Sequence, residues 1–81
     1  MALTTEETAW LRAVGLRIRL ARVSRRESQE QLGERADVSR VTLGSVERGQ
    51  HVATLTTYRK LAAALGVDVG DLVTERVPTW R

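Results

Sequence analysis

The segment from Ser28 to Gly49, SQEQLGERADVSRVTLGSVERG, constrains the fold of this chain more than any other. Ser28 stands three residues before Gln31, which is the spacing of a capping box at the start of a helix. Ser39 suits the N-cap of a second helix, and Gly49 stands where the end of that helix takes a positive φ. The segment therefore predicts two helices of about eight residues, joined by a turn of about three.

The residues inside this segment agree with that prediction. Five apolar residues are spaced to form a small core between the two helices: Leu32, Ala36, Val38, Leu43 and Val46. Asp37 falls in the turn, where the chain needs a residue that tolerates the left-handed region. This is the spacing of a helix-turn-helix, in which the second helix enters the major groove of DNA.

Three more helices and no strands are predicted. The first runs from Thr5, its N-cap, to Arg25, and buries Leu11, Val14, Ile18 and Ala21. Trp10, Leu16, Leu20 and Val23 lie off this stripe, so the helix is expected to bury more than one side. The fourth helix is capped by Thr54, ends at Gly66 and has an inner face of Leu55, Tyr58, Leu61, Ala62 and Leu65. A short fifth helix runs from Asp68 to about Thr74 and is expected to bury Val69, Leu72 and Val73. The prediction is one all-α domain over residues 1–81, with an extended first helix.

Composition excludes several classes of protein. The chain has 81 residues, no cysteine and a single histidine, so disulfides are excluded and a zinc site is not expected. No apolar run approaches the ~20 residues of a membrane span. Glu6 and Glu7 stand where a signal peptide would be basic, which favours a cytoplasmic protein. The sequence contains no Ser/His/Asp set, no metal cluster and no phosphate-cradling glycine loop, so we expect neither an enzyme nor a cofactor.

Charge is unevenly distributed along the chain. Residues 12–60 contain 11 basic and 5 acidic residues, whereas the rest of the chain has 2 basic and 5 acidic ones. A basic middle suggests a polyanionic partner such as nucleic acid. Charge alone also fits a solvated, arginine-rich surface with no partner.

Three stretches together resemble one family. GLRIRLAR, the Ser28 to Gly49 segment and LAAALGV are similar to the Cro/repressor-type helix-turn-helix family, also called the xenobiotic-response-element type, over about Gly15 to Leu72. The resemblance implies a five-helix, lambda-repressor-like domain that binds double-stranded DNA as a homodimer and regulates transcription from a palindromic operator. Phage repressors, controller proteins of restriction-modification systems and antitoxins are similar small proteins.

The resemblance also implies roles for single residues. The third helix, Ser39 to Arg48, would lie in the major groove. Base contacts would come from Arg40, Val41, Gly44 and Ser45, and phosphate contacts from Gln29, Ser39, Thr42, Gln50 and His51. Arg22 and Glu47 would form a structural pair. Because Val41 and Gly44 offer no polar group, we expect few direct base contacts and a large share of recognition through phosphates and DNA shape.

The chain departs from the family pattern at a few positions. Asp37 replaces a turn glycine, Gly33 stands where alanine is common, and Glu27 replaces an apolar residue that would staple the second helix. Gly33 and Glu27 are predicted to cost helix stability. Four other arginines are expected to be mostly solvated: Arg17, Arg19, Arg25 and Arg26.

The acidic, apolar end of the chain, residues 68–81, is the predicted dimer region. Its candidate interface residues are Val69, Leu72, Val73, Val77 and Trp80, and the N-terminal turns around Trp10 are a second candidate. No small-molecule ligand is expected. The alternative function is a protein-binding adaptor or antitoxin that uses the same fold to neutralise a partner protein.

Overall fold

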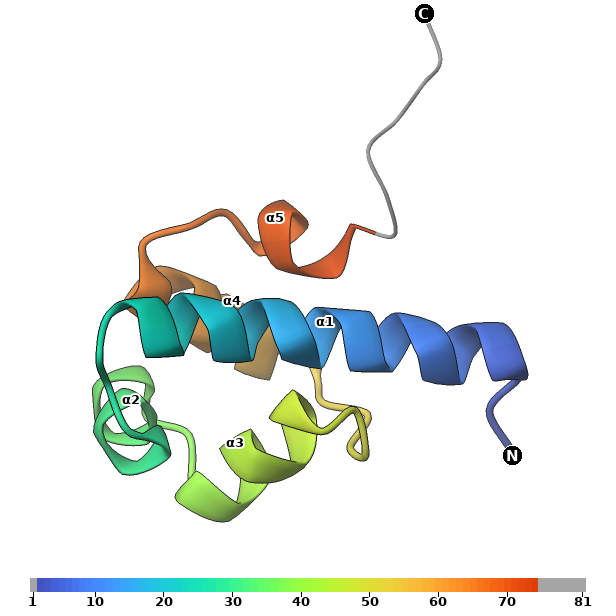
Figure 1. Cartoon of the computed structure of the whole chain (residues 1–81), viewed down its shortest axis with the longest axis horizontal. Coiled ribbons are helices and arrows are strands. Elements are labelled where there is room, and N and C mark those ends of the chain that lie inside the picture. The colour runs from blue at the N-terminus through green and yellow to red at the C-terminus, as the bar shows by residue number, and fades with distance from the viewer. Residues whose placement is uncertain (1, 75–81) are drawn as a thin grey trace, which may run out of the picture.

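The computed structural model describes residues 2–74, which form five α-helices and no strand. Their bounds are α1 Thr5–Ser24, α2 Gln29–Ala36, α3 Arg40–Glu47, α4 Leu55–Leu65 and α5 Val69–Val73. The long α1 crosses the middle of the molecule; α2 and α3 lie on one side of it, α5 on the other, and α4 behind it (Figure 1). The all-α prediction is confirmed.

Polar caps start the first two helices. In α2 the backbone N–H of Gln31 donates to Ser28 Oγ at 3.0 Å, and the Ser28 N–H donates to Gln31 Oε1 at 2.8 Å, which confirms the predicted capping box. In α1 the cap is Thr4 rather than the predicted Thr5, because Thr4 forms the same reciprocal pair with Glu7. In a capping box, the side chain that accepts from the N–H of the cap residue lies three residues after the cap. Glu7 lies at that position relative to Thr4.

Four helices end on a residue in the left-handed region. These residues are Arg26, Asp37, Gly49 and Gly66, with φ of 58°, 57°, 70° and 73°. At each end the N–H of this residue and the N–H of the next one donate back to carbonyls of the last helical turn. Asp37, Gly49 and Gly66 were predictable from residue type, whereas nothing about Arg26 indicates a left-handed conformation.

The core lies where α1 meets the other helices. Its most deeply buried side chains are Val14, Ile18, Leu32, Leu43, Leu61 and Leu65. Tyr58 is buried with them, and this burial raises the pKa of its hydroxyl above the ordinary value of 10.0. The predicted inner faces of α2, α3 and α4 are therefore largely confirmed, and they position the helix-turn-helix unit against α1 and α4.

Two predictions about buried faces are wrong. Leu16, Leu20 and Val23 are 50%, 59% and 51% exposed, so α1 buries only one side. The helices α3, α4 and α5 all pack against that side, and no described element covers the opposite one. Leu55 is 66% exposed although it keeps the helical rhythm, since it is the first residue of α4. Apolar spacing predicts a face but not whether a neighbour is present to cover it.

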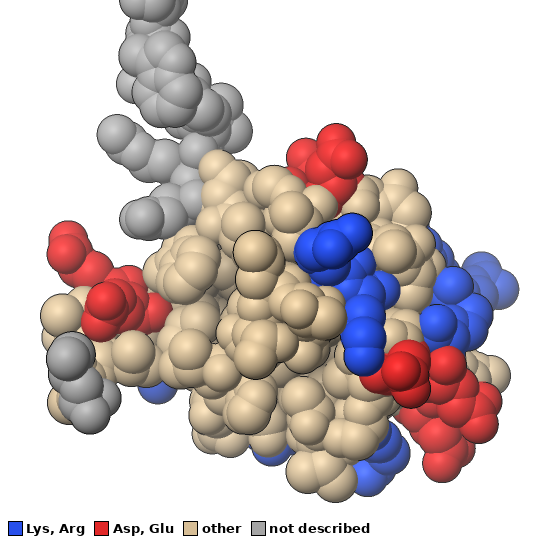
Figure 2. Space-filling view, turned by 180° about the vertical axis from the view of Figure 1, so that it is seen from behind, with Lys and Arg blue, Asp and Glu red and all other residues tan. Residues whose placement is uncertain are grey.

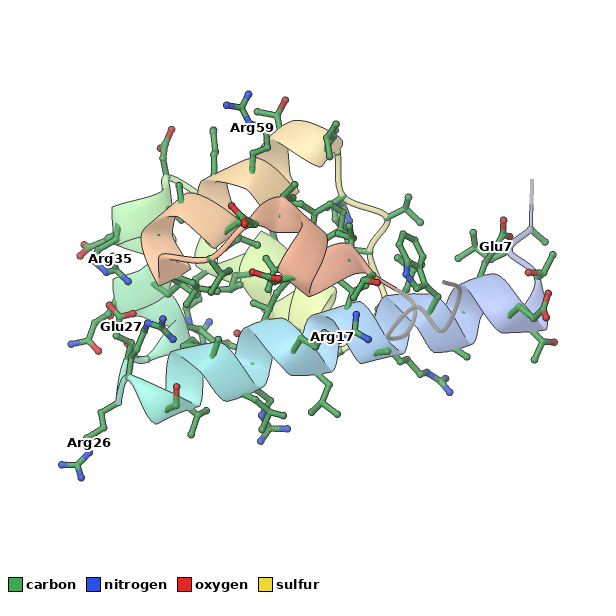
Figure 3. All side chains as sticks on the ribbon, turned by 90° about the horizontal axis from the view of Figure 1, so that it is seen from above. Glu7, Arg17, Arg26, Glu27, Arg35 and Arg59 are labelled. Carbon is green, nitrogen blue, oxygen red and sulfur yellow. The ribbon has the colours of Figure 1, made fainter. Side chains whose placement is uncertain are left out.

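The short α5 is held by side chains of α1. Trp10 Nε1 donates to the carbonyl of Val73 at 2.8 Å, and Arg17 Nη1 donates to the carbonyl of Leu72 at 3.1 Å and to that of Thr74. The Arg17 side chain extends from α1 toward α5 in Figure 3. The carbonyls at the end of a helix lack partners within the helix, and here α1 supplies donors for them. Arg17 is therefore a structural residue rather than a solvated one.

Burial also corrects the predicted dimer surface. Leu72 is only 3% exposed and belongs to the core of its own chain, so it is not available to a second chain. Val69 and Val73 are partly buried against the same core. Val77 and Trp80 lie outside the described residues. A helix of five residues packs against the core only if its largest apolar side chain is buried there. In α5 that side chain is Leu72.

Arg25 is likewise a structural residue. Its guanidinium donates to the carbonyl of Ala21 at 2.9 Å and to that of Leu65 at the end of α4. It thereby ties the ends of α1 and α4 together, while the residue stays exposed to solvent, as predicted. Arg19 and Arg26 are exposed, as predicted, and Arg26 points away from the molecule (Figure 3).

The two residues predicted to weaken α2 both have structural roles. Glu27 accepts from Arg35 Nε at 2.6 Å and from Arg35 Nη2 at 2.7 Å, and the two side chains face each other in Figure 3. The hydrogen bond from Arg35 lowers the pKa of Glu27. A Cβ on Gly33 would lie 2.5 Å from the carbonyl oxygen of Val38, so the missing side chain lets the turn close against α2. The ion pair between Glu27 and Arg35 thus takes the place of the apolar contact that would otherwise staple the start of α2.

Candidate nucleic-acid interface

The turn between α2 and α3 is held at both ends. The Val38 N–H donates to the carbonyl of Gly33 at 2.9 Å, across the left-handed Asp37. Lys60 on α4 donates to the carbonyl and to the carboxylate of Asp37, both at 3.4 Å. Asp37 therefore replaces glycine at a conformation that Asp tolerates, and its exposed carboxylate also pairs with α4. This fixes the direction in which α3 leaves the turn.

A buried ion pair, together with the amide of Gln29, joins α1, α2 and α3. Arg22 of α1 donates through Nε and Nη2 to the two carboxylate oxygens of Glu47, at 2.7 and 2.9 Å. The side chains of Arg22 and Glu47 are 12% and 2% exposed. Gln29 Nε2 donates to Glu47 Oε1 at 3.1 Å, and Arg22 Nη1 donates to the carbonyl of Glu27 at 2.7 Å. The hydrogen bonds that Arg22 donates to Glu47 raise the pKa of Arg22.

This network sets the position of α3 relative to α1 and α2. A two-pronged guanidinium–carboxylate contact defines an orientation as well as a distance. Arg22 and Glu47 form the structural pair that the resemblance implies. The amide of Gln29 is part of the same network. The sequence does not predict this contact, because residues 22, 29 and 47 share no local pattern.

Two glycines allow α1 and α3 to approach closely. A Cβ on Gly15 would lie 2.3 Å from the carbonyl oxygen of Val46, and one on Gly49 would lie 2.7 Å from the Cα of Arg12. Both distances are far below van der Waals contact, so larger residues would push the helices apart. Gly15 lies within α1, and its position in the sequence alone does not predict that α3 packs against it.

The outward side of α3 contains fewer residues than predicted. Arg40 is exposed, Val41 is 74% exposed, and Ser45 is partly exposed. Gly44 is buried, which corrects its assignment as an open base-contact position. The point where its Cβ would stand lies 3.3 Å from Nη1 of Arg48 and 3.5 Å from Oε1 of Gln29. These two side chains lie over Gly44 because it has no side chain of its own.

The residues expected to contact phosphates lie around this side. Ser39 Oγ caps α3 by accepting from the Thr42 N–H at 3.1 Å, and it donates to Thr42 Oγ1 at 2.9 Å. Gln50 is exposed and accepts from Arg48 Nε at 3.0 Å. His51 is exposed in the following loop. Gln29 lies at the start of α2, partly buried, with its amide N–H on Glu47. All of these contacts leave lone pairs or donors for a ligand.

The face that contains α4 is less suited to a polyanion. Figure 2 shows basic side chains near the middle of this face, acidic ones toward its edges, and a broad uncharged area beside them. A depression of about 520 Å³ lies between α2 and α3. The acidic Glu30, Glu34 and Asp37 line it, together with Gly33, Val38, Ser39 and Arg40. Within residues 2–74, no three His, Cys, Asp or Glu side chains are placed so that they could hold a metal ion together. None of the described helices is long and apolar enough to span a membrane.

Comparison with known sequences identifies relatives. A profile of the family described as Helix-turn-helix matches residues 18–72. An immunity repressor protein of Bacillus phage phi105 is 40% identical over 62 residues, which are 76% of this chain and 43% of the repressor. The chain thus spans less than half the length of this curated relative.

Solved structures share the fold. The restriction-modification controller protein C.AhdI from Aeromonas hydrophila is 38% identical, with a TM-score of 0.76 over 79% of this chain and 97% of the controller. The hypothetical transcription factor NHTF from Neisseria is 32% identical, with a TM-score of 0.77 over 90% and 84% of the two chains. These relatives are a repressor, a controller and a transcription factor, not enzymes. The chain belongs to the helix-turn-helix family, as its sequence predicted.

Proposed function

We propose that this protein regulates transcription by binding double-stranded DNA in a sequence-specific manner, with α3 in the major groove. The observation that carries the proposal is the network in which Arg22, Glu47 and Gln29 hold α3 against α1 and α2. It presents Arg40, Val41 and Ser45 on an edge of α3 that no described helix covers. A rigid helix with an uncovered polar edge suits major-groove reading.

Each outward residue supports a definite contact. The Arg40 guanidinium matches the O6 and N7 acceptors of guanine. Val41 packs against a thymine methyl group, and the Ser45 hydroxyl bonds to several bases and discriminates weakly. Gln29, Ser39, Thr42, Gln50 and His51 surround this edge as phosphate contacts. With so few base contacts, DNA shape contributes a large share of the specificity.

The protein acts as a homodimer on a roughly palindromic operator in the bacterial nucleoid. The relatives include a repressor and a controller protein, which supports a regulatory role for this chain. Two copies of α3 would enter successive major grooves ~34 Å apart on one face of the duplex. The predicted contact between the copies is the exposed part of α5 and the residues that follow it.

Selection of bound sites from random DNA, followed by titration against salt, tests the proposal. We expect one enriched, palindromic sequence, and an affinity that falls steeply with salt because phosphate contacts release counterions. Absence of enrichment together with a flat salt response would overturn DNA binding. Those results would instead favour the protein-binding adaptor or antitoxin function.

Substitution of Arg40 tests the base contact. We expect Arg40→Ala to lose about 1–3 kcal/mol of binding free energy on the selected operator and much less on random DNA. The matched control is Arg59→Ala, which removes the same charge from an exposed position on α4 (Figure 3). Equal losses for Arg40→Ala on both DNAs would make Arg40 a backbone contact.

A further inference from the structure

Arg48 occupies the edge of α3 on which Gly44 leaves a gap. Positions 40, 44 and 48 are four residues apart, so they follow one another along a single helix edge. Arg48 is the C-cap of α3 and keeps helical dihedral angles, with φ −85° and ψ −3°. Side chains on a helix lean toward its N-terminus, which directs the guanidinium of Arg48 back over Gly44.

The contacts of Arg48 agree with this direction. Nη1 lies 3.3 Å from the point where a Cβ of Gly44 would stand, and the amide oxygen of Gln29 reaches within 3.5 Å of the same point. Nε donates to Gln50 Oε1 at 3.0 Å, and Nη2 to Ser45 Oγ at 3.5 Å. The guanidinium therefore lies between residues 45 and 50, above a backbone without a side chain.

The charge of Arg48 remains uncompensated by the protein. Its hydrogen-bond acceptors, Gln50 and Ser45, are both neutral, and no carboxylate of residues 2–74 forms an ion pair with it. Arg22 and Arg35, by contrast, are each paired with a glutamate. Neutral acceptors orient a guanidinium without cancelling its attraction for an anionic or strongly accepting ligand.

We propose that Arg48 is a second base-reading residue, which contacts a guanine through the space that Gly44 leaves open. This inference rests on the proposed DNA-binding function. Gly44 then has a definite role: its missing side chain lets the Arg48 guanidinium lie level with Ser45, one turn closer to Arg40 than its own Cα. The base-reading edge is thus made of Arg40, Val41, Ser45 and the guanidinium of Arg48.

The first test compares Arg48 variants on the operator selected with the unmodified protein. We expect Arg48→Ala to weaken operator binding by about 5- to 150-fold, the range of one bidentate base contact, and to relax selection at one guanine position. Arg48→Lys keeps the charge but not the fork, so it retains affinity for random DNA and loses selectivity. Arg59→Ala is the control for loss of charge. An Arg48→Ala loss that is equal on operator and random DNA would overturn the proposal and make Arg48 a phosphate contact.

A double-mutant cycle separates a base-reading role from a structural one. Gly44→Ala adds a Cβ that pushes the Arg48 guanidinium a few tenths of an ångström away from its place over residue 44, so it is expected to weaken operator binding. It is also expected to raise the thermal midpoint, because alanine favours a helix. In the Arg48→Ala background, the same change is expected to cost much less binding. Additive losses would overturn the proposal. If the unmodified protein binds no DNA at all, the proposed function fails first, and the two failures are distinguishable.

Discussion

At the scale of single residues, Glu47 shows how much of the interface depends on one buried carboxylate. It accepts both prongs of Arg22 and the amide of Gln29, which come from α1 and α2. A carboxylate with a 2% exposed side chain is tolerable only when its oxygens are satisfied by donors, one of them charged. Glu47 therefore acts on DNA binding through the placement of α3 rather than by touching a base.

Substitution of this carboxylate separates stability from placement. We expect Glu47→Ala to lower the free energy of unfolding by about 3 kcal/mol, because it leaves Arg22 buried without its partner. The double variant Arg22→Met/Glu47→Leu replaces the pair by apolar groups and is expected to restore most of that loss. DNA affinity is expected to stay low in both, since Gln29 loses its acceptor. Urea unfolding and operator titration measure the two effects; full recovery of DNA affinity in the double variant would contradict the positioning role.

The pKa of Tyr58 predicts an alkaline loss of stability. Burial raises it above 10.0 in the folded chain, so above pH ~10 the unfolded state releases this proton first and stability falls as pH rises. Tyr58→Phe has no proton to release and is expected to flatten this decline. Tyr58 is the chain's one tyrosine, so the absorbance of tyrosinate reports it directly. Identical alkaline profiles for the two proteins would contradict the prediction.

At the scale of elements, the ends of α1 and α2 determine the position of the helix-turn-helix unit, α2 and α3. Both end on a non-glycine residue in the left-handed region, Arg26 and Asp37, and these two positions flank α2. Asp37 is supported by Lys60. Arg26 points into solvent and gains no comparable contact, so its conformation is a cost that the other contacts of the turn offset.

Replacement of Arg26 by glycine removes that cost. We expect Arg26→Gly to raise the free energy of unfolding by about 0.5–1 kcal/mol, since glycine adopts positive φ without a steric penalty. Arg26→Ala removes the same side-chain charge but keeps the Cβ, and it is expected to bring no such gain. Thermal unfolding of the three proteins provides the measurement. A gain for alanine equal to that for glycine would point to charge rather than backbone conformation.

At the scale of the whole molecule, α1 organises the other helices. It contacts α3 through Gly15, α5 through Trp10 and Arg17, and the end of α4 through Arg25. One face of α1 is thereby fully used, and the opposite face, with Leu16, Leu20 and Val23, is exposed among the described residues. The proposed dimer thus has two candidate surfaces, the one formed by the partly buried valines of α5 and this exposed face of α1.

A matched pair of variants locates the dimer contact. We expect Val69→Asp, at a partly buried position of α5, to shift the protein toward monomer, because a buried carboxylate opposes association. Leu20→Asp places the same charge on the exposed face of α1 and is expected to leave the dimer intact. Analytical ultracentrifugation across micromolar concentrations measures both, with circular dichroism as the check on folding. Dissociation by Leu20→Asp alone would move the contact to α1.

Much of the fold was predictable because its signals are local. Caps three residues from their partners, glycines at helix ends and apolar residues three or four apart predicted all five helices and most of the core. Leu16, Leu20 and Leu55 keep an apolar rhythm but lack a neighbour that covers them. Leu72, which the sequence pattern assigns both to the buried side of the fifth helix and to the dimer contact, fills a gap in its own core.

The sequence by itself determined the class of the protein: the helix-turn-helix unit, its order of caps and turns, and the residues available to read DNA. Only the tertiary structure decided which of them face outward. Gly44 is covered and Arg48 lies over it, while Arg17 and Arg25 donate to backbone carbonyls at the ends of α5 and α4. The physical reason is range. Caps and periodicity act within a few residues, whereas a side chain's partner is set by helices that meet only after the chain has folded.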